Sequence, residues 1–233
     1  MMKKLLLTLS LVFLLCGRSG ATTVTLQNGL NGYTGQKDCQ TQSDDGNIHI
    51  EGYGLRIYAN NYDVIYFDLS SIPASATINS ATLSLYIDPS VYYTSGTIHY
   101  GYLLDPSSTG NVYTWEGSAF YDYNQHATFN KKKSEATSVL WQESGTTNIT
   151  GVLSELGTLA ISSSGWKDLD ITDGVQEYVN GTTNMGFYVG GGTANIGSFE
   201  DYLNKWATGN YPKLVVDYTV GGGATRRRPI IIQ

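Results

Sequence analysis

Two neighbouring stretches of the chain alternate between hydrophobic and polar residues with a period of two. In residues 62–69, Ile65, Phe67 and Leu69 fall on one side, and residues 81–88 repeat the pattern. Successive side chains leave a β-strand on opposite sides, so the pattern predicts two strands that each bury one face. The connection contains Pro73, which cannot donate a ladder hydrogen bond and therefore predicts a loop. Two half-buried strands joined in this way indicate a β-sandwich.

The same alternation predicts further short strands. Asn-Gly and Gly-rich steps between them supply turns, because Asn and Gly tolerate positive φ. Residues 105–165 are the least regular part of the chain, and we interpret much of this stretch as a functional loop or an insertion. The predicted strands fall at residues 22–26, 48–59 (two strands), 97–104, 158–162, 166–171, 186–190, 196–200 and 213–220.

The hydrophobic period changes at residue 173. Val175, Tyr178 and Val179 have the spacing of one face of a helix, which predicts a short helix near 173–180. We place Trp166 and Tyr178 in the core. The whole pattern predicts an all-β fold: a jelly-roll β-sandwich of two antiparallel sheets with this one helix.

The first residues have the composition of a secretory signal peptide. A basic start and an apolar run at residues 5–15, too short to span a bilayer, precede the small residues Ser19-Gly20-Ala21 of a cleavage site. We therefore expect a protein that is secreted and stays extracellular or on the cell surface, without a transmembrane segment. The predicted organisation is a signal peptide at 1–21, the sandwich domain at 22–220, and a Gly linker with a basic and apolar tail at 221–233.

The charge of the chain limits its partners. The formal net charge is −6, and the predicted signal peptide carries three basic residues and no acidic one, so the remaining chain is more acidic still. Such a surface repels nucleic acid and anionic membranes, and we expect neither as a partner. Only Cys39 remains after cleavage, so the fold is held by its core rather than by an internal disulfide.

Four segments resemble, in the right order, the DNRLRE domain family, which is related to carbohydrate-binding module family 96 and to the disaggregatase-related domains. The resemblance implies a jelly-roll β-sandwich of the kind attached to secreted polysaccharide-degrading enzymes or found on surface proteins. The chain departs from the family pattern in residues 105–165. The four segments are LQNGLNGYTGQKDCQTQ (26–42), FDLSSIPASATINSATLSLYI (67–87), GWKDLDITDGVQEYVNGTTNMGFYV (165–189) and YPKLVVDYTV (211–220).

A catalytic motif is not visible in the sequence. His49, His99 and His126 have no metal-ligand spacing, and no G-x-S-x-G or P-loop occurs. We therefore expect that the protein is not an enzyme, and a hydrolase or lyase is the least favoured reading. Asp168 and Asp170 have three interpretations. They are an acid–base pair, or they lie on the polar face of a strand, or they are ligands of a structural calcium ion. Calcium is the only cofactor suggested, and none is required.

Polysaccharide binding needs flat aromatic faces for the sugar rings and polar groups for their hydroxyls. Aromatic residues outside the predicted strands supply such faces, although many Trp and Tyr in a sandwich belong to the core or the sheet faces. A basic side chain can pair with the carboxylates of an acidic polysaccharide, and the alternative is that it is only solvated by water. The candidate carbohydrate-binding residues are Trp115, Tyr121, Tyr123, Trp141, Tyr92, Tyr93 and Arg56.

These observations predict a secreted, non-catalytic module that binds or organises extracellular polysaccharide. The alternative is a structural or adhesive surface protein that self-assembles. In that reading the C-terminal tail, with three isoleucines at residues 230–232, adds as a strand to a partner.

Overall fold

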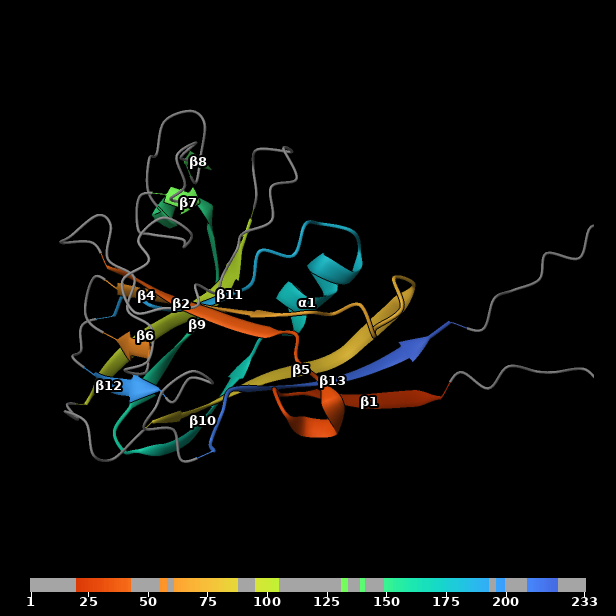
Figure 1. Ribbon diagram of the computed structural model, residues 1–233, viewed down its shortest axis with the longest axis horizontal. Helices are drawn as coiled ribbons and strands as arrows, with labels where there is room; N and C mark the ends of the chain where they lie inside the picture. Colours follow the sequence, from red (N-terminus) through yellow and green to blue (C-terminus); the bar gives the residue numbers. More distant parts are fainter. Residues whose placement is uncertain are drawn as a thin grey trace, which may run out of the picture.

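Two antiparallel sheets packed face to face form most of the described part of the protein (Figure 1), and the predicted all-β sandwich with one short helix is confirmed. The jelly-roll connectivity stays a prediction. The computed structural model describes residues 20–42, 55–57, 61–87, 95–104, 131–133, 139–140, 149–192, 196–199 and 209–221.

Sheet A is the larger sheet, and β5 (Ala76–Ile87) is its central strand. Ser84 of β5 is paired with Lys213 of β13 and with Asp168 of β10, so these two strands flank β5 on opposite sides. Strand β1 pairs with β13, β12 pairs with the end of β5, and β3 pairs with β12. Their bounds are β1 (Ala21–Leu26), β3 (Leu55–Ile57), β10 (Gly165–Asp170), β12 (Ile196–Phe199) and β13 (Lys213–Val220).

Sheet B has five strands in the order β2-β4-β11-β6-β9, all antiparallel to their neighbours. A separate two-stranded sheet pairs β7 (Lys131–Lys133) with β8 (Val139–Leu140). The strands of sheet B are β2 (Gln36–Gln42), β4 (Asn61–Phe67), β6 (Gly96–Leu103), β9 (Leu153–Ile161) and β11 (Phe187–Gly190), and two 3₁₀ turns lie at Leu30–Gly32 and Ile149–Val152.

The core is filled by every second side chain of the facing strands. Phe67 of sheet B and Leu83 and Leu85 of sheet A are completely buried, as the alternation predicts. A smaller cluster around Val64 and Met185 lies on the opposite face of sheet B, because Val64 points away from the side that carries Phe67. Burial of this apolar surface is the main force that holds the two sheets together.

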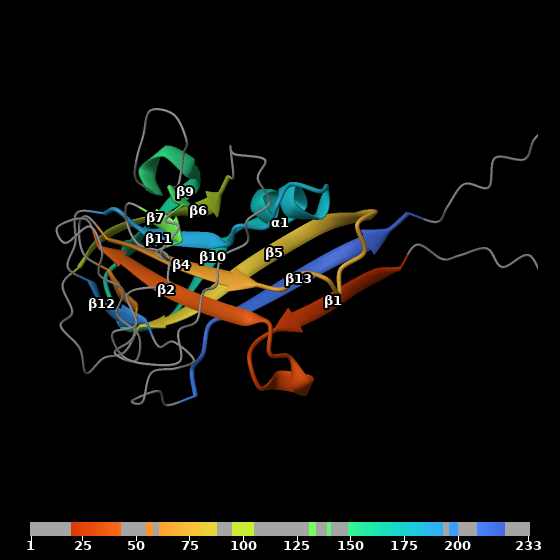
Figure 2. The ribbon, with the colours of Figure 1, turned by 45° about the horizontal axis from the view of Figure 1, so that its top comes forward.

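Helix α1 (Thr172–Val179) takes the place of a strand beside the first half of β5 (Figure 2). Beyond the end of β10, Thr172 Oγ1 accepts a hydrogen bond from the Ala81 N–H at 2.9 Å. Further along, Gln176 Oε1 accepts one from the Ile78 N–H at 2.8 Å. Two side chains of the helix therefore satisfy backbone groups that a neighbouring strand would otherwise pair.

Tyr178 connects α1 to sheet B. Its hydroxyl lies 2.8 Å from the Leu103 carbonyl and 2.6 Å from the Gly186 carbonyl, and it accepts a hydrogen bond from the Leu103 N–H at 3.1 Å. Its ring packs edge-on against Phe187, with centroids 5.5 Å apart. Burial raises the pKa of Tyr178. The predicted core position of Tyr178 is confirmed, and the residue joins the helix to two adjacent strands of sheet B, β6 and β11.

Replacing Tyr178 by Phe should lower the free energy of unfolding by about 1–3 kcal/mol, because backbone groups of Leu103 and Gly186 lose a buried partner. Urea denaturation at neutral pH measures this loss. Tyr102→Phe is the matched control. The Tyr102 ring packs edge-on against Tyr178 at 5.8 Å, but its hydroxyl has no hydrogen-bond partner among the described residues. Equal losses in the two variants would contradict the role assigned to the Tyr178 hydroxyl.

The stability of the protein should also fall in alkaline solution. Burial raises the pKa of Tyr33, Tyr178 and Tyr188 in the folded protein. Above about pH 10 the unfolded chain loses these protons while the folded chain keeps them, so the free energy of unfolding decreases as pH rises. Tyr178→Phe should make this decline shallower by about 1.4 kcal/mol per pH unit, the contribution of one proton. Identical slopes for the two proteins in urea denaturation would refute this.

Candidate functional site

Trp166 lies on the outer surface of sheet A, and its predicted place in the core is wrong. Its side chain is 40 % exposed, whereas Leu169 on the opposite face of β10 is 1 % exposed. Trp166 shares the outward face of the strand with Asp168 and Asp170, which are also exposed. The prediction followed the usual burial of tryptophan, but the alternation in Gly165–Asp170 already placed Trp166 with the two carboxylates.

Two neighbouring side chains hold Trp166 in place. The rings of Trp166 and Tyr86 meet edge to face, with centroids 5.4 Å apart and planes at 68°. Lys213 Nζ lies 4.6 Å from the centroid of the Trp166 ring. Both arrangements are attractive, because the positive edge of one ring or an ammonium group meets the negative face of another ring. We name Trp166, Tyr86, Lys213, Ser84 and Asp168 the sheet A platform.

The strand register explains why the side chains of the platform meet. Lys213, Ser84 and Asp168 are partners across three adjacent strands, so they form one polar row on the outer face of sheet A. Tyr86 and Trp166 are partners in the next row of the same face. Ser84 Oγ donates a hydrogen bond to Asp168 Oδ1 at 2.6 Å, which fixes the carboxylate within its row.

The platform combines groups that suit a hydroxylated ligand. Lys213 Nζ covers one face of the Trp166 ring, and the exposed remainder of the Trp166 side chain, with Tyr86 beside it, offers apolar surface for a sugar ring. The ammonium group of Lys213 can donate hydrogen bonds to hydroxyl oxygens, and the Asp168 carboxylate can accept them. The groups stand on one face of a sheet, so an extended ligand can contact both rows at once.

The two predicted calcium ligands each accept hydrogen bonds from the protein. Asp170 Oδ1 accepts bonds from the Thr172 N–H at 3.1 Å and from Thr172 Oγ1 at 2.6 Å, directly before α1, and Asp168 is bonded to Ser84. Within the described part of the chain, no three His, Cys, Asp or Glu side chains gather where a metal ion could sit. Calcium takes six or more oxygen ligands, and a structural calcium ion at Asp168 and Asp170 stays a prediction.

The other predicted binding residues lie outside the part of the chain that the structure describes. Arg56 falls within β3, but its side chain is likewise outside the description. Their proposed contacts with sugar therefore stay predictions. The aromatic residues concerned are Tyr92, Tyr93, Trp115, Tyr121, Tyr123 and Trp141.

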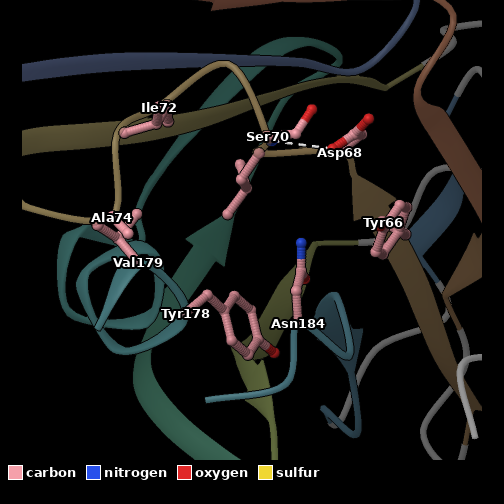
Figure 3. A pocket seen from close by; sticks show the side chains of 9 residues that line it. Tyr66, Asp68, Ser70, Ile72, Ala74, Tyr178, Val179 and Asn184 are labelled. Atoms are coloured by element: carbon pink, nitrogen blue, oxygen red, sulfur yellow. Dashed lines mark hydrogen bonds between the residues drawn. The ribbon is translucent and has the colours of Figure 1, made fainter. Parts of the chain in front are cut away.

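A pocket of about 250 Å³ opens between α1 and the loop that follows β4 (Figure 3). Sequence reasoning missed it, because its walls come from two segments more than 100 residues apart. In Figure 3, Asn184 lies between Tyr66 and Tyr178, with Asp68 and Ser70 above it. The lining residues are Tyr66, Asp68, Leu69, Ser70, Ile72, Ala74, Tyr178, Val179 and Asn184.

Hydrogen bonds fix the polar groups of this pocket. Asn184 Nδ2 donates to the Phe67 carbonyl at 2.8 Å, and Asn184 Oδ1 accepts from the Gly186 N–H at 3.1 Å. Asp68 Oδ1 accepts from the Ser70 N–H at 2.9 Å, which turns the chain directly after β4. The pocket is therefore a preformed feature of the fold.

An acid and a histidine meet on sheet B. His99 Nδ1 and Glu155 Oε1 are 3.1 Å apart, and their side chains are 39 % and 53 % exposed. An exposed pair of this kind contributes little to stability. Burial raises the pKa of the neighbouring Tyr62 and Tyr188, and the charge of Glu155 adds to the effect. These tyrosines therefore keep their protons at neutral pH.

No family model matches this chain, and a search of curated proteins found no significant similarity. The resemblance to the DNRLRE domain family therefore depends on the four sequence segments alone. Among the described residues, no helix is long and apolar enough to cross a membrane.

Asp170 should stabilise the start of α1 through its acceptor oxygen rather than through its charge. Asp170→Ala should lower the free energy of unfolding by about 1 kcal/mol, as the loss of a helix cap does, whereas Asp170→Asn should retain most of the stability because its amide oxygen still accepts from Thr172. Urea denaturation in EDTA and in millimolar calcium distinguishes this role from metal binding. A stabilisation by calcium that Asp170→Asn abolishes would show that Asp170 is a metal ligand instead.

Proposed function

We propose that this protein is a secreted, non-catalytic module that binds extracellular polysaccharide through the sheet A platform. The observation that carries the proposal is the exposure of Trp166, at 40 %, in contact with an aromatic partner and a lysine. Tryptophan side chains are on average highly buried. A tryptophan held at the surface in a fixed orientation loses little conformational freedom when a ligand stacks on it.

The arrangement of the platform favours an extended glycan chain. One sugar ring can contact the Trp166 and Tyr86 rings, and the adjoining polar row supplies Lys213 and Asp168 for hydroxyl groups. The polar row contains one cation, Lys213, and one carboxylate, Asp168, so it favours neither an anionic nor a cationic glycan. The resemblance to the DNRLRE domain family, which is related to a carbohydrate-binding module family, supports the same ligand class.

Trp166→Ala should weaken polysaccharide binding at least tenfold, which corresponds to about 1.4 kcal/mol. The measurement is retention in affinity electrophoresis through soluble polysaccharides, together with pull-down on insoluble cellulose, chitin, xylan and mannan. Leu30→Ala is the matched control, because Leu30 is 38 % exposed and lies outside the platform. The proposal fails if the wild-type protein binds none of the polysaccharides, or if Trp166→Ala binds as well as Leu30→Ala.

Self-assembly is the second candidate function, and it has its own support in sheet A. Strand β1 pairs with β13 alone among the described strands, so its other side carries backbone groups open to another strand. Ala21 is paired with Thr219, and β1 starts where β13 ends (Figure 1). The proposed donor tail, residues 224–233, lies outside the described residues.

Removing residues 224–233 separates the two functions. If the tail mediates self-assembly, the full chain forms oligomers and the truncated chain forms smaller ones. Light scattering over a range of protein concentrations measures the size of both. A polysaccharide-binding module that does not assemble keeps the same size and the same glycan affinity after truncation. We expect the second result.

A further inference from the structure

We infer that the pocket between α1 and the loop after β4 is a separate carbohydrate site that takes a single uncharged sugar unit. Its volume of about 250 Å³ lies below the roughly 300–1,000 Å³ of sites for drug-sized ligands. A space of this size fits one sugar ring rather than a segment of chain. This inference does not depend on the platform, because the two sites have no residue in common.

The lining divides into an apolar wall and a polar rim. Leu69, Ile72 and Val179 are buried and supply the apolar wall. The half-buried Tyr66 ring adds an aromatic surface, and Asp68 contributes a carboxylate at the rim. A pyranose has the matching character, with apolar C–H faces and hydroxyl groups around its edge.

The charge of the pocket restricts the ligand. The described lining contains one carboxylate and no Lys, Arg or His side chain. An anionic ligand would be repelled by Asp68 without a compensating cation. Asp68 Oδ2 receives no hydrogen bond from the described residues, so it is available to accept one from a ligand hydroxyl. One carboxylate also falls short of the several oxygen ligands that calcium requires.

The pocket is organised before any ligand enters. Both ends of the Asn184 side-chain amide are bonded to the backbone, and the Asp68–Ser70 hydrogen bond sets the loop. Tyr33 adds a bond from its hydroxyl to the Asp68 carbonyl at 3.3 Å. A preformed site spends little binding energy on ordering its own residues. With the platform on a different surface, the module would hold two glycan segments at once.

The test uses the full chain and the methyl glycosides of glucose, galactose and mannose as probes. Titration followed by ¹H–¹⁵N NMR should shift the signals of the Asn184 side-chain amide and the Ser70 N–H, with saturation in the millimolar range for at least one glycoside. Asp68→Asn should weaken this binding at least tenfold, and it leaves an oxygen to accept from the Ser70 N–H, so the loop keeps its turn. Tyr66→Leu should also weaken it, whereas Trp166→Ala should leave it unchanged.

Methyl glucuronide is the charged control, and it should bind at least tenfold more weakly than the best neutral glycoside. The inference is overturned if no neutral glycoside shifts these two signals, if the glucuronide binds equally well, or if calcium alone shifts them and the glycosides do not. Loss of glycoside binding in Trp166→Ala also overturns it. If polysaccharide retention depends on Trp166 but no glycoside binds, the pocket is not a sugar site and the proposed function stands. If a glycoside binds in the pocket but polysaccharide retention does not depend on Trp166, the pocket inference stands and the proposed function of the platform fails.

Discussion

Strand β5 must find backbone hydrogen bonds along both of its sides, and it does so with different partners. One side pairs with β13 over most of its twelve residues. The other side pairs with β10 as far as Thr82, and beyond that point side chains of α1 bond to Ala81 and Ile78. Because a buried, unpaired backbone group is costly, the part of this edge that β10 does not reach needs the side chains of α1 as partners.

Both candidate sites follow from that division. Where β10 is the partner, Trp166 comes to stand beside Tyr86 on an open sheet face. Where α1 is the partner, Tyr178 reaches across to sheet B, and Val179 faces the loop after β4 to close one wall of the pocket. The two surfaces differ in character for the same reason. A strand extends a flat face, whereas a helix beside a strand edge leaves a concave space that its side chains only partly fill.

Local patterns in the sequence were sufficient for the parts of the fold that depend on local periodicity. The burial of Phe67, Leu83 and Leu85 followed from alternation, and the burial of Tyr178 followed from its place on a helical face. Strand β2 was not predicted, because QKDCQTQ has no hydrophobic alternation and forms a strand by pairing with β4. Trp166 was misplaced because its residue type was given more weight than its position in the alternation. The pocket could not be predicted, because α1 meets the 68–74 loop only in the folded chain.

The pairing of Ala21 with Thr219 makes β1 and β13 equivalent to the two arms of a hairpin whose connecting turn is missing. A circular permutant could supply that turn, with a short linker joining the end of β13 to the start of β1, and keep every pairing of sheet A. New termini could then be opened in an exposed connection such as Ser70–Ser71, where the backbone leaves the sheet. In such a chain the β1–β13 pair would become a local contact, and its formation would no longer require two distant segments of the chain to meet.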